Sequence, residues 1–131
     1  MSKGISTIIA TIILLVITIG LAGTAYVFIS NLLKISFSKT INLLDLSCNP
    51  SGTPNQASIT IILSNDGTQN ITDSELTVLV DGNIKSPQFT FIPIIPHTTA
   101  VATSSDTYTM NRIHTVVISS PSNSVRSEVW C

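Results

Sequence analysis

The sequence predicts an α+β protein in which one long hydrophobic helix precedes an all-β sandwich. Three observations lead to this fold class. No charged residue occurs between Ile5 and Leu33, and the rest of the chain is a series of short β-type runs separated by Gly, Pro, Asn and Asp. The composition is also unusual, with 44% hydrophobic but only 10% charged residues among 131. A typical soluble domain has roughly a quarter of its residues charged. The length allows one domain with an appended segment.

Charge and composition also exclude some classes of protein. Six Lys and Arg face seven Asp and Glu, for a net charge of −1. A nucleic-acid binder needs an excess of basic side chains for its phosphate contacts, so we expect no nucleic-acid partner. The chain is rich in Ile and Val, which disordered chains lack.

The first element is the hydrophobic helix, which we expect over residues 5–40. Its uncharged run of roughly 29 residues is longer than the ~20 needed to cross a bilayer. The run is apolar around its whole circumference, which is typical of a buried or membrane-spanning helix. Lys3 and Lys34 bracket it. A cleaved secretory signal would have a shorter run of ~7–15 residues, so the stronger alternatives are a plain membrane anchor and a helix that stays on the chain after the residues before it are processed.

The residues before the helix favour the second alternative. Residues 1–7 read MSKGIST, with Lys3 and Gly4 directly before the apolar run. This pattern resembles the class III leader of archaeal type IV pilins and archaellins. The resemblance implies that a membrane peptidase cuts between Gly4 and Ile5, removing residues 1–4 as a leader peptide and leaving the helix on the mature chain. A basic residue in the leader agrees with retention of this end in the cytoplasm.

Two positions depart from the family pattern. Many family members have Pro where this chain has Thr7. Bacterial type IV pilins usually carry Glu at the fifth mature residue, which is Ile9 here. The absence of that Glu is in keeping with the archaeal branch.

One side of the helix carries small and hydroxyl residues. At 100° per residue, five of them fall within about 60° of one another. They are Thr7, Thr11, Thr18, Ala22 and Ala25. Small residues let helices approach closely, so we interpret this stripe as a helix-packing surface. The alternative is that the threonines are scattered over a lipid-facing span.

The remainder, residues 41–131, is expected to form the sandwich head domain. We predict seven strands: Ile41–Ser47, Ser58–Ser64, Glu75–Val80, Gln88–Ile92, Thr99–Thr103, His114–Ser119 and Ser124–Trp130. Turn signals at Asn65–Gly67 and Asp81–Gly82 separate them. Seven short, closely spaced strands predict an immunoglobulin-like sandwich. The two runs that end in these turn signals are similar to hairpins of archaeal pilin and archaellin heads, and also to many other surface sandwiches.

The chain has two cysteines, Cys48 and Cys131, both in the part that a Lys-flanked N-terminal span would place outside the cell. Disulfides persist there, and an even cysteine count in a secreted domain usually pairs. We expect an intramolecular Cys48–Cys131 bridge. Unpaired thiols and pairing between subunits are the alternatives.

No catalytic or metal-binding pattern stands out. His97 lies in an expected turn and His114 begins an expected strand, and neither has a partner at a catalytic or metal-ligand spacing. No Gly-x-Ser-x-Gly turn and no phosphate-binding loop are present. We therefore expect no enzyme activity, no cofactor, no metal and no small-molecule substrate.

One glycosylation sequon occurs, Asn70-Ile71-Thr72. It follows an expected turn, and exposure in a loop is what glycosylation needs. Asn70 is therefore a candidate glycan site.

The resemblance implies a function for the whole chain, that of a structural subunit of an archaeal type IV adhesive pilus. The precursor would wait in the cytoplasmic membrane, meet the prepilin peptidase and the assembly platform, and then polymerise through its helix into an extracellular homopolymer with the sandwich on the filament surface. Two alternatives remain open: an archaellin, which is the motility version of this architecture, and a single-span anchored surface module that binds a partner or acts as a stator.

Overall fold

A computed structural model describes the backbone of residues 2–131 and the side chains of residues 6–34 and 37–131. The chain divides into two compact units, Met1–Ile35 and Ser36–Cys131. Each unit is considered by itself.

The first unit is one helix, α1 (Ser2–Ser36). No acidic residue interrupts it, and Lys34 lies in its last turn, where a positive charge is favourable near the helix C-terminus. The helix ends at Ser36, and a turn over residues 37–39 follows, so the predicted extension to residue 40 is wrong by four residues.

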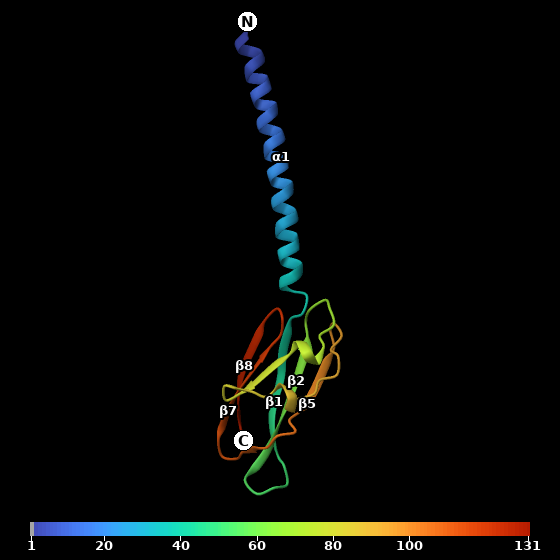
Figure 1. The fold of residues 1–131 in the computed structure, drawn as a ribbon, viewed down its shortest axis with the longest axis vertical. Helices are drawn as coiled ribbons and strands as arrows, with labels where there is room; N and C mark the ends of the chain where they lie inside the picture. The colour runs from blue at the N-terminus through green and yellow to red at the C-terminus, as the bar shows by residue number, and fades with distance from the viewer. Residues whose placement is uncertain (1) are drawn as a thin grey trace. The chain divides into compact units, whose positions relative to one another are not determined.

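The second unit consists of two four-stranded antiparallel sheets (Figure 1). The first sheet contains β1 (Ile41–Pro50), β2 (Gln56–Asn65), β5 (Thr99–Thr103) and β6 (Tyr108–Thr109). The second contains β3 (Thr77–Val80), β4 (Asn83–Ile84), β7 (Ile113–Ser119) and β8 (Ser124–Trp130). Two short 3₁₀ turns, η1 (Asp73–Glu75) and η2 (Ser86–Gln88), lie in the connections.

The strand order identifies the type of sandwich. In the first sheet β1 pairs with β2, and β2 pairs on its other side with β5 and, near its start, with β6. In the second sheet the order is β4-β3-β7-β8. In the immunoglobulin arrangement, strands A, B and E lie in one sheet and strands C, F and G in the other. Here β1, β2 and β5 take the places of A, B and E, and β3, β7 and β8 those of C, F and G, with the short β4 added beside β3. The predicted α+β fold with an immunoglobulin-like sandwich is confirmed.

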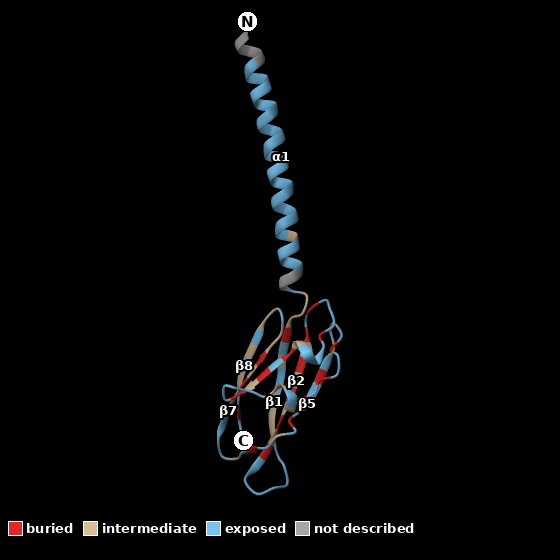
Figure 2. Ribbon diagram, in the orientation of Figure 1, coloured by how far each residue is buried: buried red, intermediate tan, exposed pale blue. Residues whose placement is uncertain are grey.

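The core lies between the two sheets (Figure 2), and alternation of buried and outward side chains builds it most clearly along β2 and β7. In β2 every second side chain is buried, including Ile59, Ile61 and Leu63. β7 shows the same pattern, with Val116 and Ile118 fully buried. Alternating burial of this kind places one face of each sheet in the core and leaves the other face outside.

The predicted strand over Gln88–Ile92 is wrong. Phe89 and Phe91 alternate and are buried, as strand residues would be, but this segment belongs to neither sheet. The amide of Phe91 instead donates to the carboxylate of Asp73, at 2.9 Å. The hydrophobic alternation therefore reports contact with the core and not pairing with another strand.

Smaller differences concern the ends of elements. The predicted strand Glu75–Val80 begins only at Thr77, because η1 occupies the residues before it. The two-residue strands β4 and β6 were not predicted, since two residues are too few to show a period.

Candidate functional site

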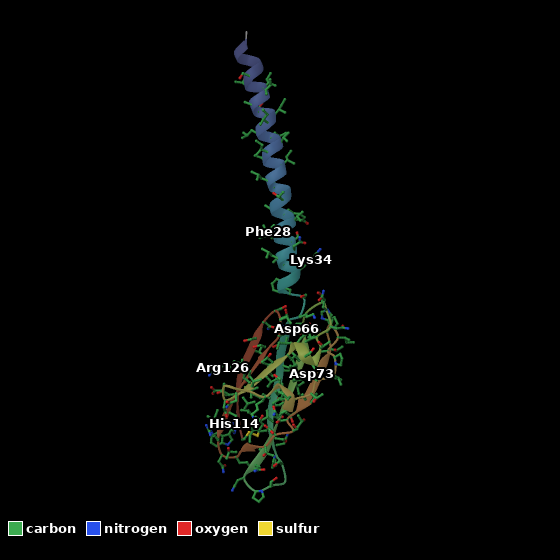
Figure 3. The ribbon with its side chains drawn as sticks, viewed as in Figure 1. Phe28, Lys34, Asp66, Asp73, His114 and Arg126 are labelled. Carbon is green, nitrogen blue, oxygen red and sulfur yellow. A yellow bond between two sulfur atoms is a disulfide. The ribbon has the colours of Figure 1, made fainter. Side chains whose placement is uncertain are left out.

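The most unusual surface of the described chain is α1. Residues 6–34 form a span long and apolar enough to cross a membrane. At 1.5 Å per residue this segment is about 44 Å long, against about 30 Å for a bilayer core. Its large apolar side chains are 48–73% exposed, and Phe28 and Lys34 both project from the helix surface (Figure 3). A surface of this kind is stable only in lipid or against other apolar surfaces.

The predicted packing stripe contains hydroxyls that are satisfied within the helix. Thr11 donates to the carbonyl of Ile8 and Thr18 to that of Leu15, each at 2.8 Å. Thr24, which lies off the stripe, bonds its own helix in the same way. A threonine that bonds its own backbone presents little more than a methyl group to its neighbours, so these residues suit an apolar environment.

Ala22 and Ala25 are exposed on the helix surface, as is Thr7. The predicted processing residues Lys3, Gly4 and Ile5 have side chains outside the described part of the structure.

The predicted disulfide is confirmed. Cys48, on β1, is bonded to Cys131, which follows β8, with the two Cα atoms 5.3 Å apart. The cysteines are separated by 83 positions in the sequence, so the bond closes a covalent loop over most of the sandwich. Because β1 and β8 belong to different sheets, the bond also joins the two sheets at one corner.

The predicted glycan site lies on the surface. Asn70 is exposed, and it immediately precedes Ile71, which forms an isolated bridge with Ile94. The Thr72 side chain is also exposed, and its hydroxyl contacts Glu75. The position is therefore accessible, and its modification stays a prediction.

Residues 38–41, here called the entry strap, are held to the sandwich by two loops. The carbonyl of Ser38 accepts hydrogen bonds from the amides of Thr68 and Gln69, at 3.0 and 2.9 Å. On the other side, Asn123 makes two bonds to the backbone of Ile41, accepting from its amide and donating to its carbonyl. The strap is thus held through its own backbone at both ends, by loop amides at Ser38 and by the Asn123 side chain at Ile41.

Gly67 marks the closest contact of the entry strap. A Cβ atom at this position would lie 2.4 Å from the carbonyl oxygen of Ser38 and 2.8 Å from the amide nitrogen of Thr40. Both are backbone atoms of the entry strap, which the hydrogen bonds at Ser38 and Ile41 hold in place. The absence of a side chain at Gly67 is therefore what permits the strap to lie against the sandwich.

We expect Gly67→Ala to destabilise the sandwich by about 2–3 kcal/mol, the upper part of the range for overpacking against a rigid neighbour. Urea unfolding of the full chain in a non-ionic detergent, followed by near-ultraviolet circular dichroism, measures the change. Thr68→Ala is the matched control, because it alters the adjacent exposed side chain and keeps the strap's backbone bonds. Equal stability of the Gly67 variant and the wild type would contradict this account.

Asn65, at the end of β2, has a fully buried polar side chain whose oxygen and nitrogen are both hydrogen-bonded. Its Oδ1 accepts from the amide of Gly67 at 2.9 Å. Its Nδ2 donates to the carbonyls of Gln69 and Ile94, at 2.7 and 2.9 Å. One side chain therefore joins the turn after β2 to the loop that precedes β5.

An ion pair also ties the entry strap to η1. Lys39 Nζ pairs with Glu75 Oε1, and the other carboxylate oxygen accepts from the amide of Thr72 at 3.0 Å. The hydrogen bond from Lys39, followed by that from Thr72, lowers the pKa of Glu75 from 4.5 to about 2. Both bonds favour the charged carboxylate, which is the cause of the shift.

These bonds predict a loss of stability in acid. A carboxyl group with a lowered pKa in the folded state contributes stability that is complete above its unfolded pKa of 4.5 and is lost as the pH falls toward about 2. We expect the melting temperature of the full chain in non-ionic detergent to fall over this range. Glu75→Gln should flatten the fall, whereas Glu128→Gln, at an exposed and loosely paired site, should not. An identical pH profile for Glu75→Gln and the wild type would contradict the assignment.

The buried His114, on β7, pairs with the exposed Asp81 in the turn between β3 and β4; Figure 3 labels the histidine. His114 is 3% exposed, its Nδ1 lies 2.6 Å from Oδ2 of Asp81, and its Nε2 lies 3.0 Å from the carbonyl of Thr109. Burial raises the pKa of Asp81, but the hydrogen bonds from His114 and from the amide of Thr115 outweigh it, so the net pKa is lowered. Tyr108 packs edge-on against the ring, with the ring centroids 5.5 Å apart.

The role of the His114–Asp81 pair is structural. A catalytic histidine needs one ring nitrogen free for a substrate or a nucleophile, and both nitrogens of His114 are already occupied. The other histidine, His97, is exposed in a turn with positive φ. Within the described residues, no three His, Cys, Asp or Glu side chains gather in a way that could hold a metal ion.

Sequence reasoning missed the entry strap and the Asn65 site as functional parts of the fold. Only a turn signal at Asn65–Gly67 pointed toward them. Comparison with known proteins gives no family: no protein-family model matches this chain, and no curated protein sequence matches it.

Proposed function

We propose that this chain is a structural subunit of an archaeal type IV pilus-like surface filament, assembled through α1 with the sandwich exposed on the outside. The observation that supports this most is the exposed apolar helix of residues 6–34, joined in one chain to a disulfide-bonded immunoglobulin-like sandwich. The helix needs an apolar partner, and the disulfide favours an oxidising, extracellular location for the sandwich.

The physical argument for assembly rests on the surface of α1. Lipid tails and the apolar side chains of neighbouring helices are similar environments, so moving a helix from bilayer to filament has little hydrophobic cost. The stripe of Thr7, Thr11, Thr18, Ala22 and Ala25 lets helices approach closely, which supplies the packing energy that lipid does not. Residues 1–4 would be removed by a prepilin-type peptidase before assembly, as the Lys3-Gly4 pair suggests.

Sequencing the N-terminus of the mature protein tests processing. We expect a chain that begins at Ile5. A mature chain that begins at Met1 would sink the processed-subunit proposal and favour a permanently anchored surface module. Negative-stain microscopy of material sheared from the cell surface tests assembly directly, because filaments containing this chain are the expected product.

The packing stripe gives a sharper test. We expect Ala22→Phe to abolish filament assembly, because a large ring on the stripe keeps neighbouring helices apart by more than their close-packed distance. Ile13→Phe, on the opposite side of α1, is the control and should assemble more readily. Filament yield after shearing is the measurement, and normal filaments from the Ala22 variant would count against the stripe as the packing surface.

A further inference from the structure

The outer faces of the two sheets differ in chemistry, and together they contain most of the exposed large apolar side chains of the sandwich. Leu44 and Val101 lie on the outer face of the β1-β2-β5 sheet, which we call the polar face. Ile84, Ile113 and Trp130 lie on the outer face of the β4-β3-β7-β8 sheet, which we call the apolar face.

The polar face is almost free of charge. Its strands carry Ser, Thr and Asn outward, and Thr60 and Thr103 are hydrogen-bonded to each other across β2 and β5 at 3.1 Å. Asp45 is the one charged residue on its described strands. The strand register places Asp45, Ile62 and Val101 side by side in one row across β1, β2 and β5.

The apolar face contains a row with the same layout and the opposite charge. Register places Arg126 on β8 next to Val117 on β7, and Val117 next to Leu79 on β3. Ile84 on β4 completes the row. In both rows a charged residue on an outer strand is followed by apolar residues at one and two strand spacings, roughly 5 and 10 Å away.

The charge on Arg126 is available for a partner. Within the described part of the chain it forms an ion pair with Glu128 at 3.9 Å, and the two side chains are 69% and 58% exposed. A pair this long and this exposed contributes little to stability. Figure 3 shows Arg126 at the edge of the sandwich.

From these two rows we infer that the polar face of one sandwich docks on the apolar face of a second copy of this chain, with Asp45 opposite Arg126 and Ile62 and Val101 opposite Val117 and Leu79. This inference rests on the proposed filament function. The contact joins two different surfaces, so the copy that contributes its polar face keeps its apolar face free for the next copy, and the other copy keeps its polar face free. Contacts of this heterologous type extend into helical assemblies, whereas a face that pairs with itself closes a dimer.

Charge reversal tests the contact in the full chain expressed in its source cells. Asp45→Arg and Arg126→Asp are each expected to lower the yield of sheared filaments about tenfold, since each places like charges together. The double variant restores the opposite pair and is expected to recover yield to within about twofold of the wild type. Asp66→Arg, an exposed acidic residue in the turn after β2, is the control and should assemble normally. Melting temperatures confirm that each variant folds.

A photo-crosslinker at Val101 provides an independent readout. p-Benzoylphenylalanine placed there is expected to link two chains, with the second attachment mapped by mass spectrometry to β3 or β7. Normal assembly of both single variants, or crosslinks to the polar face, would overturn the inference. Rescue of Arg126→Asp by Glu128→Arg instead of Asp45→Arg would show that the apolar face pairs with itself. Absence of wild-type filaments would overturn the proposed function, and with it this contact.

Discussion

Asn65→Asp is expected to destabilise the sandwich by about 3–5 kcal/mol at neutral pH, because it leaves an uncompensated charge in the interior. The substitution keeps the shape of the side chain and exchanges the amide nitrogen for oxygen. That nitrogen donates to the carbonyls of Gln69 and Ile94, so the new carboxylate would face two acceptors with no donor between them. The bond from the amide of Gly67 remains.

The pH dependence of this variant separates charge from shape. Burial raises the pKa of an introduced carboxyl group, so the loss of stability is largest above the ordinary pKa of Asp and becomes smaller as the group protonates in acid. Urea unfolding of the full chain in non-ionic detergent at pH 7 and pH 4 measures both values. Asn70→Asp, at an exposed asparagine five positions further on, is the control and should leave stability nearly unchanged. Equal stability of the two variants would contradict the role assigned to Asn65.

Removing the Cys48–Cys131 bond is expected to cost about 4–5 kcal/mol, because the unfolded chain regains the freedom of a loop closed over 83 positions. Such a loss is a large fraction of the stability of a small domain. The effect acts mainly on the unfolded state, so the folded arrangement of the two sheets should persist in the variant under mild conditions.

The double variant Cys48→Ala/Cys131→Ala, compared with the oxidised wild type, measures this loss. The urea midpoint should fall, and reduction of the wild type should give a similar midpoint to that of the variant. Mass analysis of the unreduced protein provides the covalent check, with two hydrogens fewer than the reduced chain. If the double variant and the oxidised wild type had the same urea midpoint, a stabilising role for the bond would be contradicted.

Much of the architecture could be predicted because it depends on side chains that repeat. The helix was visible in the uncharged run from Ile5 to Leu33, and β2 in the alternation of Ile59, Ile61 and Leu63. The disulfide could be predicted because the chain has two cysteines and an oxidising location leaves them few other states. In each case the residue type itself carries the information.

The remaining features depend on backbone contacts between distant segments, which leave little trace in a sequence. Phe89 and Phe91 alternate like a strand, and their pattern does not reveal that Asp73 takes the amide that a neighbouring strand would have used. Gly67 is of a residue type that is common in turns, and its contact with Ser38 is visible only once the chain is folded. The same holds for the two rows across the sheets, which exist only through strand register.

In the filament proposed above, the disulfide has a mechanical consequence. Residues 48–131 form one closed ring, so a pull transmitted through the helix can draw out only residues 37–47 before it meets a covalent bond. That segment spans at most roughly 40 Å when fully extended. Beyond Cys48 the tension divides between two paths, one along the chain from Cys48 and one through the disulfide to Cys131. The shorter path limits how far the sandwich can lengthen. The bond thus sets a covalent limit on how far the chain can be extended under tension.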